Sequence, residues 1–222
     1  MRPAALLICS ALVLSGASAL AETPSDPAPR QDNIEVMEDA QAGDHWTYEI
    51  RDEISGTLKS TLVQTITDVS ANEIGVQVTW LGNSDTGFLT FDRNWNVKTS
   101  GAWRYQQGDG TGISPPLSIG KSWPIKSNDV NASNGTNFRR TGTSKVVGQE
   151  NVTTKAGTFQ SYKIETTLQG VNAKDPSRKM QLTQTTWYAP EIDHWIKRTS
   201  ETRIDGHVQG RSVMELVEYG RR

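Results

Sequence analysis

A faint internal duplication constrains the fold of this 222-residue chain more than any other feature. Residues 43–48 (Gly-Asp-His-Trp-Thr-Tyr) recur in outline at residues 120–125 (Gly-Lys-Ser-Trp-Pro-Ile). Residues 91–98 similarly match residues 191–197, since both segments contain an Asp and then a Trp followed closely by a β-branched residue and Lys. The two matches lie at different offsets, so loops of different length must separate the matched parts. The pattern predicts a β scaffold built from two similar halves.

Alternation of apolar and polar positions continues from residue 43 almost to the C-terminus. Residues 74–80 form the clearest half-buried strand of the first half, and residues 162–168 and 180–188 alternate in the second half. Long stretches with the 3.6-residue period of a helix do not occur. We therefore predict a mostly β protein, a single strongly curved antiparallel sheet or half-open barrel. A curved sheet fits the duplication better than a sandwich, because the two halves can pair into one continuous sheet.

The length of the chain suits one β domain with a sizeable core. We place this domain at residues 42–222, with half-repeats at about residues 43–101 and 120–200. Residues 22–41, which are rich in Pro and acidic residues, are expected to form a flexible lead-in.

The first 21 residues have the pattern of a signal peptide. Arg2 precedes a short apolar run, and Ala19-Leu20-Ala21 provides the small residues of a cleavage site. The apolar run is too short to span a bilayer, so no stable membrane span is expected after the signal is removed. Cys9 is the only cysteine and lies in this run, so the exported protein would contain no disulfide. We predict a periplasmic or secreted protein.

Charge excludes one class of partner. The formal net charge is −2, and the basic residues form no concentrated positive face in the sequence. Binding to nucleic acid generally requires such a face, so we expect no nucleic-acid partner.

Motifs for chemistry are missing from the sequence. The three histidines, His45, His194 and His207, have no partner at a metal-ligating spacing, and His45 and His194 are expected to face solvent beside a buried Trp. Residues 108–112 and 127–131 contain oxygen donors, and we interpret them as plain turns, with calcium binding left open. We predict no catalytic residues, no metal site and no cofactor.

Aromatic residues are the most promising feature that remains. The Trp residues related by the duplication are expected in the core, Trp46 with Trp123 and Trp95 with Trp195. Trp103 and Tyr105 have no counterpart in the other half and lie beside the Gly-rich residues 108–112. We therefore predict these two residues as ligand contacts.

The second half of the chain carries a family resemblance. Its residues are Val-Thr-Thr-Lys-Ala-Gly-Thr-Phe at 152–159, Tyr-Lys-Ile-Glu at 162–165, Thr-Trp-Tyr-Ala-Pro at 186–190 and Trp-Ile-Lys at 195–197. They resemble an uncharacterised family of exported bacterial β domains, a domain of unknown function, over about residues 140–200. The resemblance implies an envelope location and a curved sheet akin to that of lipoprotein carriers. It implies no activity and no catalytic residues.

The function that these features favour is non-enzymatic. We expect a periplasmic binding or envelope-maintenance protein that holds an apolar ligand or a partner's segment on its curved sheet. Its partner would be a lipid, a glycan or an envelope protein. Two alternatives stay open at this point: a hydrolase acting on envelope glycans, which would need two carboxylates across a cleft, and a structural adaptor.

Overall fold

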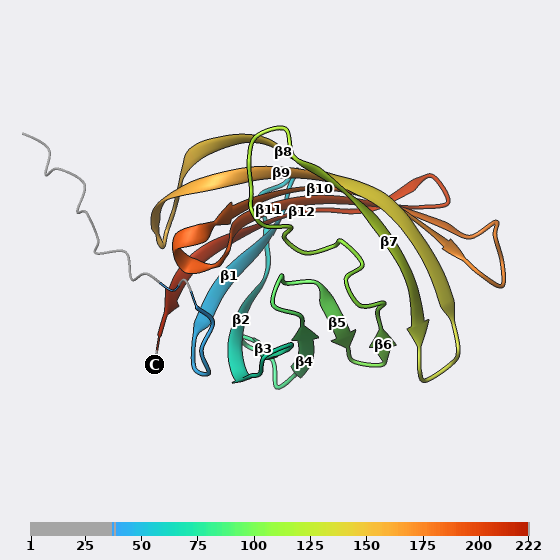
Figure 1. Cartoon of the computed structure of the whole chain (residues 1–222), viewed down its shortest axis with the longest axis horizontal. Helices are drawn as coiled ribbons and strands as arrows, with labels where there is room; N and C mark the ends of the chain where they lie inside the picture. Colours follow the sequence, from blue (N-terminus) through green and yellow to red (C-terminus); the bar gives the residue numbers. More distant parts are fainter. Residues whose placement is uncertain (1–36, 38, 222) are drawn as a thin grey trace, which may run out of the picture. The chain divides into compact units, whose positions relative to one another are not determined.

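The structure, a computed structural model, describes residue 37 and residues 39–221 (Figure 1). The predicted signal peptide (1–21), Cys9 and nearly all of the predicted lead-in (22–41) lie outside the described residues. The described part of the chain contains no helix with the length and hydrophobicity that crossing a membrane requires. Its elements are β1 (His45–Asp52), β2 (Leu58–Val69), β3 (Ile74–Trp80), β4 (Thr86–Phe91), β5 (Val97–Ser100), β6 (Trp103–Arg104), β7 (Ser122–Asn131), β8 (Asn137–Thr154), β9 (Gly157–Asn172), β10 (Lys179–Ala189), the 3-10 helix η1 (Pro190–Ile192), β11 (His194–Ile204) and β12 (His207–Gly220).

The strands form a closed antiparallel barrel in which each strand pairs with its neighbours in the chain. The ring closes where β1 pairs with β12, from His45 opposite Gly220 to Asp52 opposite Ser212. The short strands β5 and β6 complete the opposite side by linking β4 to β7. The prediction of a mostly β, antiparallel fold is confirmed. The prediction of a half-open barrel or single curved sheet is wrong, because β1 and β12 exchange hydrogen bonds with each other and leave no open edge.

The two sides of the barrel differ in strand length. Strands β8 to β12 run for 11 to 18 residues, whereas β3 to β6 run for two to seven. Figure 1 shows the long strands arching over the short ones. On β7, burial alternates strictly, with Trp123, Ile125, Ser127 and Asp129 buried between exposed neighbours. The segment 127–131, interpreted from the sequence as a turn, is therefore the second half of a strand.

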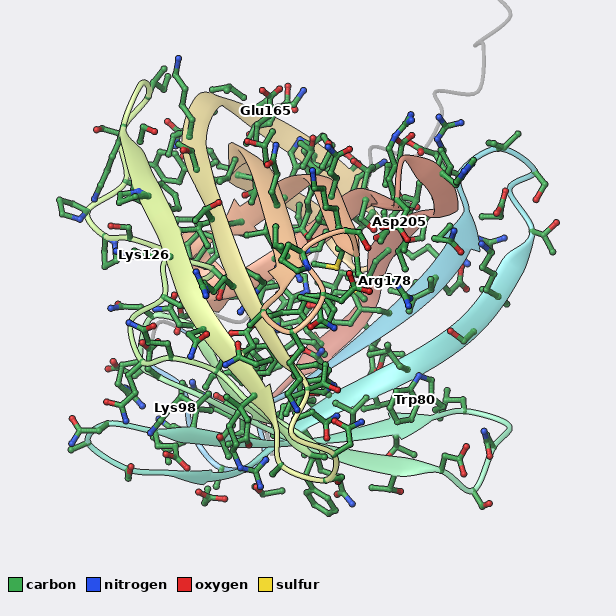
Figure 2. All side chains as sticks on the ribbon, turned by 90° about the vertical axis from the view of Figure 1, so that its right-hand side faces the viewer. Trp80, Lys98, Lys126, Glu165, Arg178 and Asp205 are labelled. Atoms are coloured by element: carbon green, nitrogen blue, oxygen red, sulfur yellow. The ribbon has the colours of Figure 1, made fainter. Side chains whose placement is uncertain are left out.

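Turn chemistry sets the register of the long hairpins. Asp205 and Gly206 alone connect β11 to β12, and both have positive φ (49° and 83°), as the twist of a two-residue hairpin favours. Figure 2 shows Arg178 and Asp205 close together at this end of the barrel, and Arg178 Nε lies 3.6 Å from Asp205 Oδ2. Asp205 also accepts the Lys179 N–H at 2.8 Å, which ties the tip to β10.

The two duplicated Gly-x-x-Trp segments have the same local structure. Gly43 and Gly120 both have positive φ, 95° and 90°. Gly43 N donates to Ile66 O and Gly120 N donates to Val146 O, both at 2.8 Å. In each case the same strand residue then donates back to the residue after the Gly. Each Gly thus turns the chain into a strand that carries its Trp inward.

The core centres on stacked rings. Trp46, Trp95, Trp123 and Trp195 are all buried, as expected for the Trp residues of both halves. The prediction that His194 faces solvent is wrong, because this imidazole is fully buried and stacks on Trp46 and Trp195 at centroid distances of 4.1 and 3.8 Å. The alternation fails there because the register between β10 and β11 shifts at Trp187 and Tyr188, which leaves Ile196 as an extra residue on β11. His194, Trp195 and Ile196 are consequently all buried.

The connection between β6 and β7, residues 105–121, packs against both sides of the barrel. Ile113 N donates to Asn94 O at 2.7 Å, and Lys126 N donates to Asp109 O at 2.9 Å. A Cβ atom at Gly112 would lie 2.2 Å from Asn94 O, so only glycine permits this approach. We call residues 105–121 the connecting segment.

Candidate functional site

A cavity of about 210 Å³ lies inside the barrel, bounded by β4, β5, β7 to β11 and the connecting segment. Its position follows from the strand alternation, which turns residues 164, 166 and 168 of β9 and residues 182, 184 and 186 of β10 toward it. The apolar walls include Ile125, Ile164, Leu168 and Leu182, and the hydroxyl and amide groups come from Ser144, Thr166, Gln184 and Thr186. Its charged lining residues are two arginines, Arg140 and Arg198, and no described carboxylate lines it. Apolar walls with a few placed polar groups are typical of small-molecule sites.

Arg140, on β8, is neutralised by two buried carboxylates. Its Nη2 lies 2.9 Å from Asp109 Oδ2 in the connecting segment, and its Nε contacts Asp129 Oδ2 on β7. Both aspartate side chains are almost completely buried, and Ser127 donates to Asp129 as well. This cluster joins the connecting segment to β7 and β8. The carboxylate of the predicted 108–112 turn, that of Asp109, is therefore paired with an arginine. Within the described residues, no cluster of side chains that could hold a metal ion occurs.

Arg198, on β11, has no such compensation. Its Nε donates to Thr186 Oγ1 at 3.2 Å, and its guanidinium carbon lies 4.0 Å from the centre of the Trp195 ring. Among the ion pairs of residues 39–221, none includes Arg198. Burial lowers the pKa of Arg198 to about 10, and Tyr48 opposes this shift. The side chain therefore stays protonated at neutral pH and presents a positive charge to the cavity.

The structure separates the two predicted ligand contacts. Tyr105 lines the cavity, with the Arg140 guanidinium 5.0 Å from its ring centre. Burial raises the pKa of Tyr105, and the charge of Arg140 partly opposes the rise. Trp103, on the short strand β6, does not line the cavity, and its ring lies 6.1 Å from that of Phe138. Of the pair, Tyr105 alone is in a position to touch a molecule in the cavity.

A second hollow, of about 500 Å³, adjoins the first. Trp95 and Ile113 border both hollows, and the remaining lining includes the Pro115-Pro116 pair. At its wall Tyr188 Oη donates to Asp193 Oδ1 at 2.5 Å. Burial raises the pKa of both groups. We call this space the outer hollow and the one with Arg198 the inner cavity.

Sequence reasoning missed Arg198 and Arg140, the two charged residues of the inner cavity. The signal for Arg198 was its alternation with Ile196, which places an arginine on the buried side of a strand. Arg140 stands beside Arg139 in the sequence, and arginines in such a pair are usually solvated. Burial in fact divides that pair, because Arg139 is exposed and Arg140 turns inward.

A family model matches part of the chain. Residues 125–212 match the model of the DUF3108-like family. This range includes β8 to β11 and most of the residues that line the inner cavity. No curated protein matches the sequence.

Solved structures share the fold. A predicted lipoprotein from Parabacteroides distasonis superposes with a TM-score of 0.52 at 12% identity, over 84% of this chain and 98% of that chain. A predicted exported protein with a YmcC-like fold from Bacteroides fragilis superposes with a TM-score of 0.50 at 15% identity, over 84% of this chain and 100% of that chain. At these identities the likeness shows the fold alone. The resemblance seen at residues 140–200 is confirmed by the family match, which covers residues 125–212.

Proposed function

We propose that this protein is a non-enzymatic binding protein of the cell envelope whose barrel encloses the apolar part of a small ligand. The inner cavity carries the proposal. It combines aliphatic walls from β7, β9 and β10 with a small number of polar groups, and it lies in the interior of a closed barrel. Barrels of more than eight strands have more interior than their side chains fill, and such interiors enclose ligand cavities or channels.

Two observations support the envelope location. Residues 1–21 predict export, and two structures of the same fold are described as a predicted lipoprotein and a predicted exported protein. Enclosure in the barrel would keep an apolar molecule away from water while it is transported or stored in an aqueous compartment.

The alternative of a glycan hydrolase finds no support in the inner cavity. Hydrolysis of a glycosidic bond needs two carboxyl groups roughly 5 to 10 Å apart across the substrate. No carboxylate among the described residues lines this cavity. Asp109 and Asp129 contact the lining residue Arg140, and both carboxylates are paired with this arginine.

A neutral fluorescent probe tests the proposal on the full chain. N-phenyl-1-naphthylamine should bind with enhanced emission, and the Leu182→Trp variant should lose this binding because the indole fills the inner cavity. The matched control is Thr183→Trp, which adds the same ring at an exposed position on the same strand.

Retention of probe binding by Leu182→Trp, or an equal loss of binding in both variants, would place the probe outside the cavity and overturn the proposal. Native mass spectrometry of the chain purified after export provides a second readout. A small molecule released on denaturation is the expected result.

A further inference from the structure

The inner cavity has a chemical asymmetry that identifies the kind of ligand. Both of its charged groups are cations, yet only Arg140 has carboxylate partners. Arg198 is half-buried, and a charge that is withdrawn from water without a partner is costly, because the protein interior does not replace the water that solvated it. Such a charge is expected where a ligand of opposite sign supplies the missing partner.

The hydrogen bonds of Arg198 leave its outer edge unused. Only Nε has a partner among the described side chains, Thr186 Oγ1. The same oxygen also accepts from Gln184 Nε2 at 3.1 Å, which holds the hydroxyl in place on β10. The stack on Trp195 fixes the plane of the guanidinium from the other side. Both Nη atoms, which form the fork that suits a carboxylate, therefore remain for a ligand.

The size of the cavity limits the rest of the ligand. An apolar cavity of roughly 150 Å³ is enough to admit benzene, and the inner cavity has about 210 Å³. This space suits a short or medium aliphatic chain and excludes a whole phospholipid. Ile125, Ile164 and Leu168 provide the surface against which such a chain would pack.

Resting on the proposed function, we infer that the inner cavity binds a medium-chain carboxylic acid, with its carboxylate on the Nη atoms of Arg198 and its aliphatic chain between β7, β9 and β10. The outer hollow, which meets the inner cavity at Trp95 and Ile113, provides the side from which the molecule enters. Arg140 plays no direct part, because Asp109 and Asp129 already neutralise it.

The test compares octanoate with 1-octanol, which has the same chain length and no charge, by isothermal titration calorimetry on the full chain at neutral pH. Octanoate should bind about tenfold more tightly or better, because a charge-assisted hydrogen bond is worth at least that factor. Arg198→Met should remove this preference and leave octanol binding in place. Arg198→Lys, which keeps the charge and loses the fork, should retain part of the preference.

Arg139→Met is the control, because it removes the same net charge from an exposed position on β8; it should leave the octanoate preference unchanged. Equal affinities for octanoate and octanol in the wild type, or a preference that survives Arg198→Met, would overturn the inference while the proposed function stands. Failure of both molecules and of the neutral probe to bind would overturn the two together. Circular dichroism of each variant confirms that it is folded.

Discussion

Two parts of the same barrel interior are filled in opposite ways. One part, which we call the indole cluster, consists of Trp46, Trp95, His194 and Trp195, with ring centroids 3.8 to 6.1 Å apart. The other part is the inner cavity, where threonine, serine, glutamine and arginine side chains line a space that the chain itself leaves open. Trp95 and Trp195 belong to both, so the boundary between a filled and an open interior runs along two indoles.

The difference follows from barrel width and side-chain volume. Eight strands already give an interior just wide enough for side chains to fill, and this barrel has twelve strands. The indole cluster fills the added width with the largest side chains available. Where the inward positions hold Ser144 and Thr166 instead, which hydrogen-bond to each other at 2.8 Å, the width remains as a cavity. The contrast thus separates the part that stabilises the fold from the part available for a ligand.

The largest expected effect on stability comes from a substitution in the indole cluster. Trp46→Ala removes a fully buried ring and should lower the free energy of unfolding by about 3 to 5 kcal/mol. Leu182→Ala, at the wall of the inner cavity, should cost only about 1 to 2 kcal/mol, because its side chain already borders empty space. Chemical denaturation of both variants measures the difference. Equal losses would show that the two parts are packed to the same density.

The second comparison concerns the two arginines of the cavity. Arg140→Met leaves Asp109 and Asp129 buried without a partner and should destabilise the fold by about 3 kcal/mol. Arg198→Met removes an unpaired charge, so it should be neutral or stabilising when no ligand is bound. The signs should therefore differ, as urea denaturation at neutral pH will show. A similar loss in both variants would mean that Arg198 has a compensating partner.

Acid should act on the indole cluster through His194. Burial lowers the pKa of His194 well below that of a free histidine, and the charge of Arg198 adds to the shift. Below about pH 6.5 the imidazole therefore binds a proton in the unfolded chain but stays neutral in the folded chain. The free energy of unfolding should consequently fall by about 1.4 kcal/mol for each pH unit below that value. His194→Gln should remove this slope between pH 7 and pH 5.

His207→Gln is the control for that measurement, because His207 is exposed on β12. Burial raises the pKa of the carboxyl groups of Glu191 and Asp193, which acts in the opposite direction at lower pH. Both variants keep these carboxyls, so their contribution cancels in the comparison. An unchanged slope in His194→Gln would assign the acid sensitivity to another group.

The sequence predicts the strands better than it predicts their closure. Period-two patterns located residues 74–80 and 162–168 because each strand has one buried face, and Asp205-Gly206 fixed a hairpin through its own turn chemistry. Closure depends on the pairing of β1 with β12, which are separated by most of the chain, and no local pattern reports such a pairing.

The candidate site was harder to predict, for a related reason. The inner cavity collects single residues from many strands, and each looks ordinary in its own segment. Arg198 differs from an outward-facing arginine only by the alternation of β11, which the shift between Trp187 and Tyr188 disturbs. Tyr105 was predicted as a ligand contact from its position beside a Gly-rich segment, and the same argument placed Trp103 with it, although the structure puts the Trp103 ring near Phe138.

The smallest expected effect separates those two aromatic residues and locates the edge of the cavity. Tyr105→Leu should weaken octanoate binding by about fivefold, because it removes a lining ring and a contact of Arg140, a loss on the order of 1 kcal/mol. Trp103→Leu removes a larger ring from outside the cavity and should leave the affinity unchanged, even though it loosens the contact with Phe138. Calorimetric titration of both variants gives the affinities. A larger loss in Trp103→Leu would mean that the ligand reaches beyond the inner cavity toward the short strands β5 and β6, and the boundary drawn here between open and filled interior would have to move.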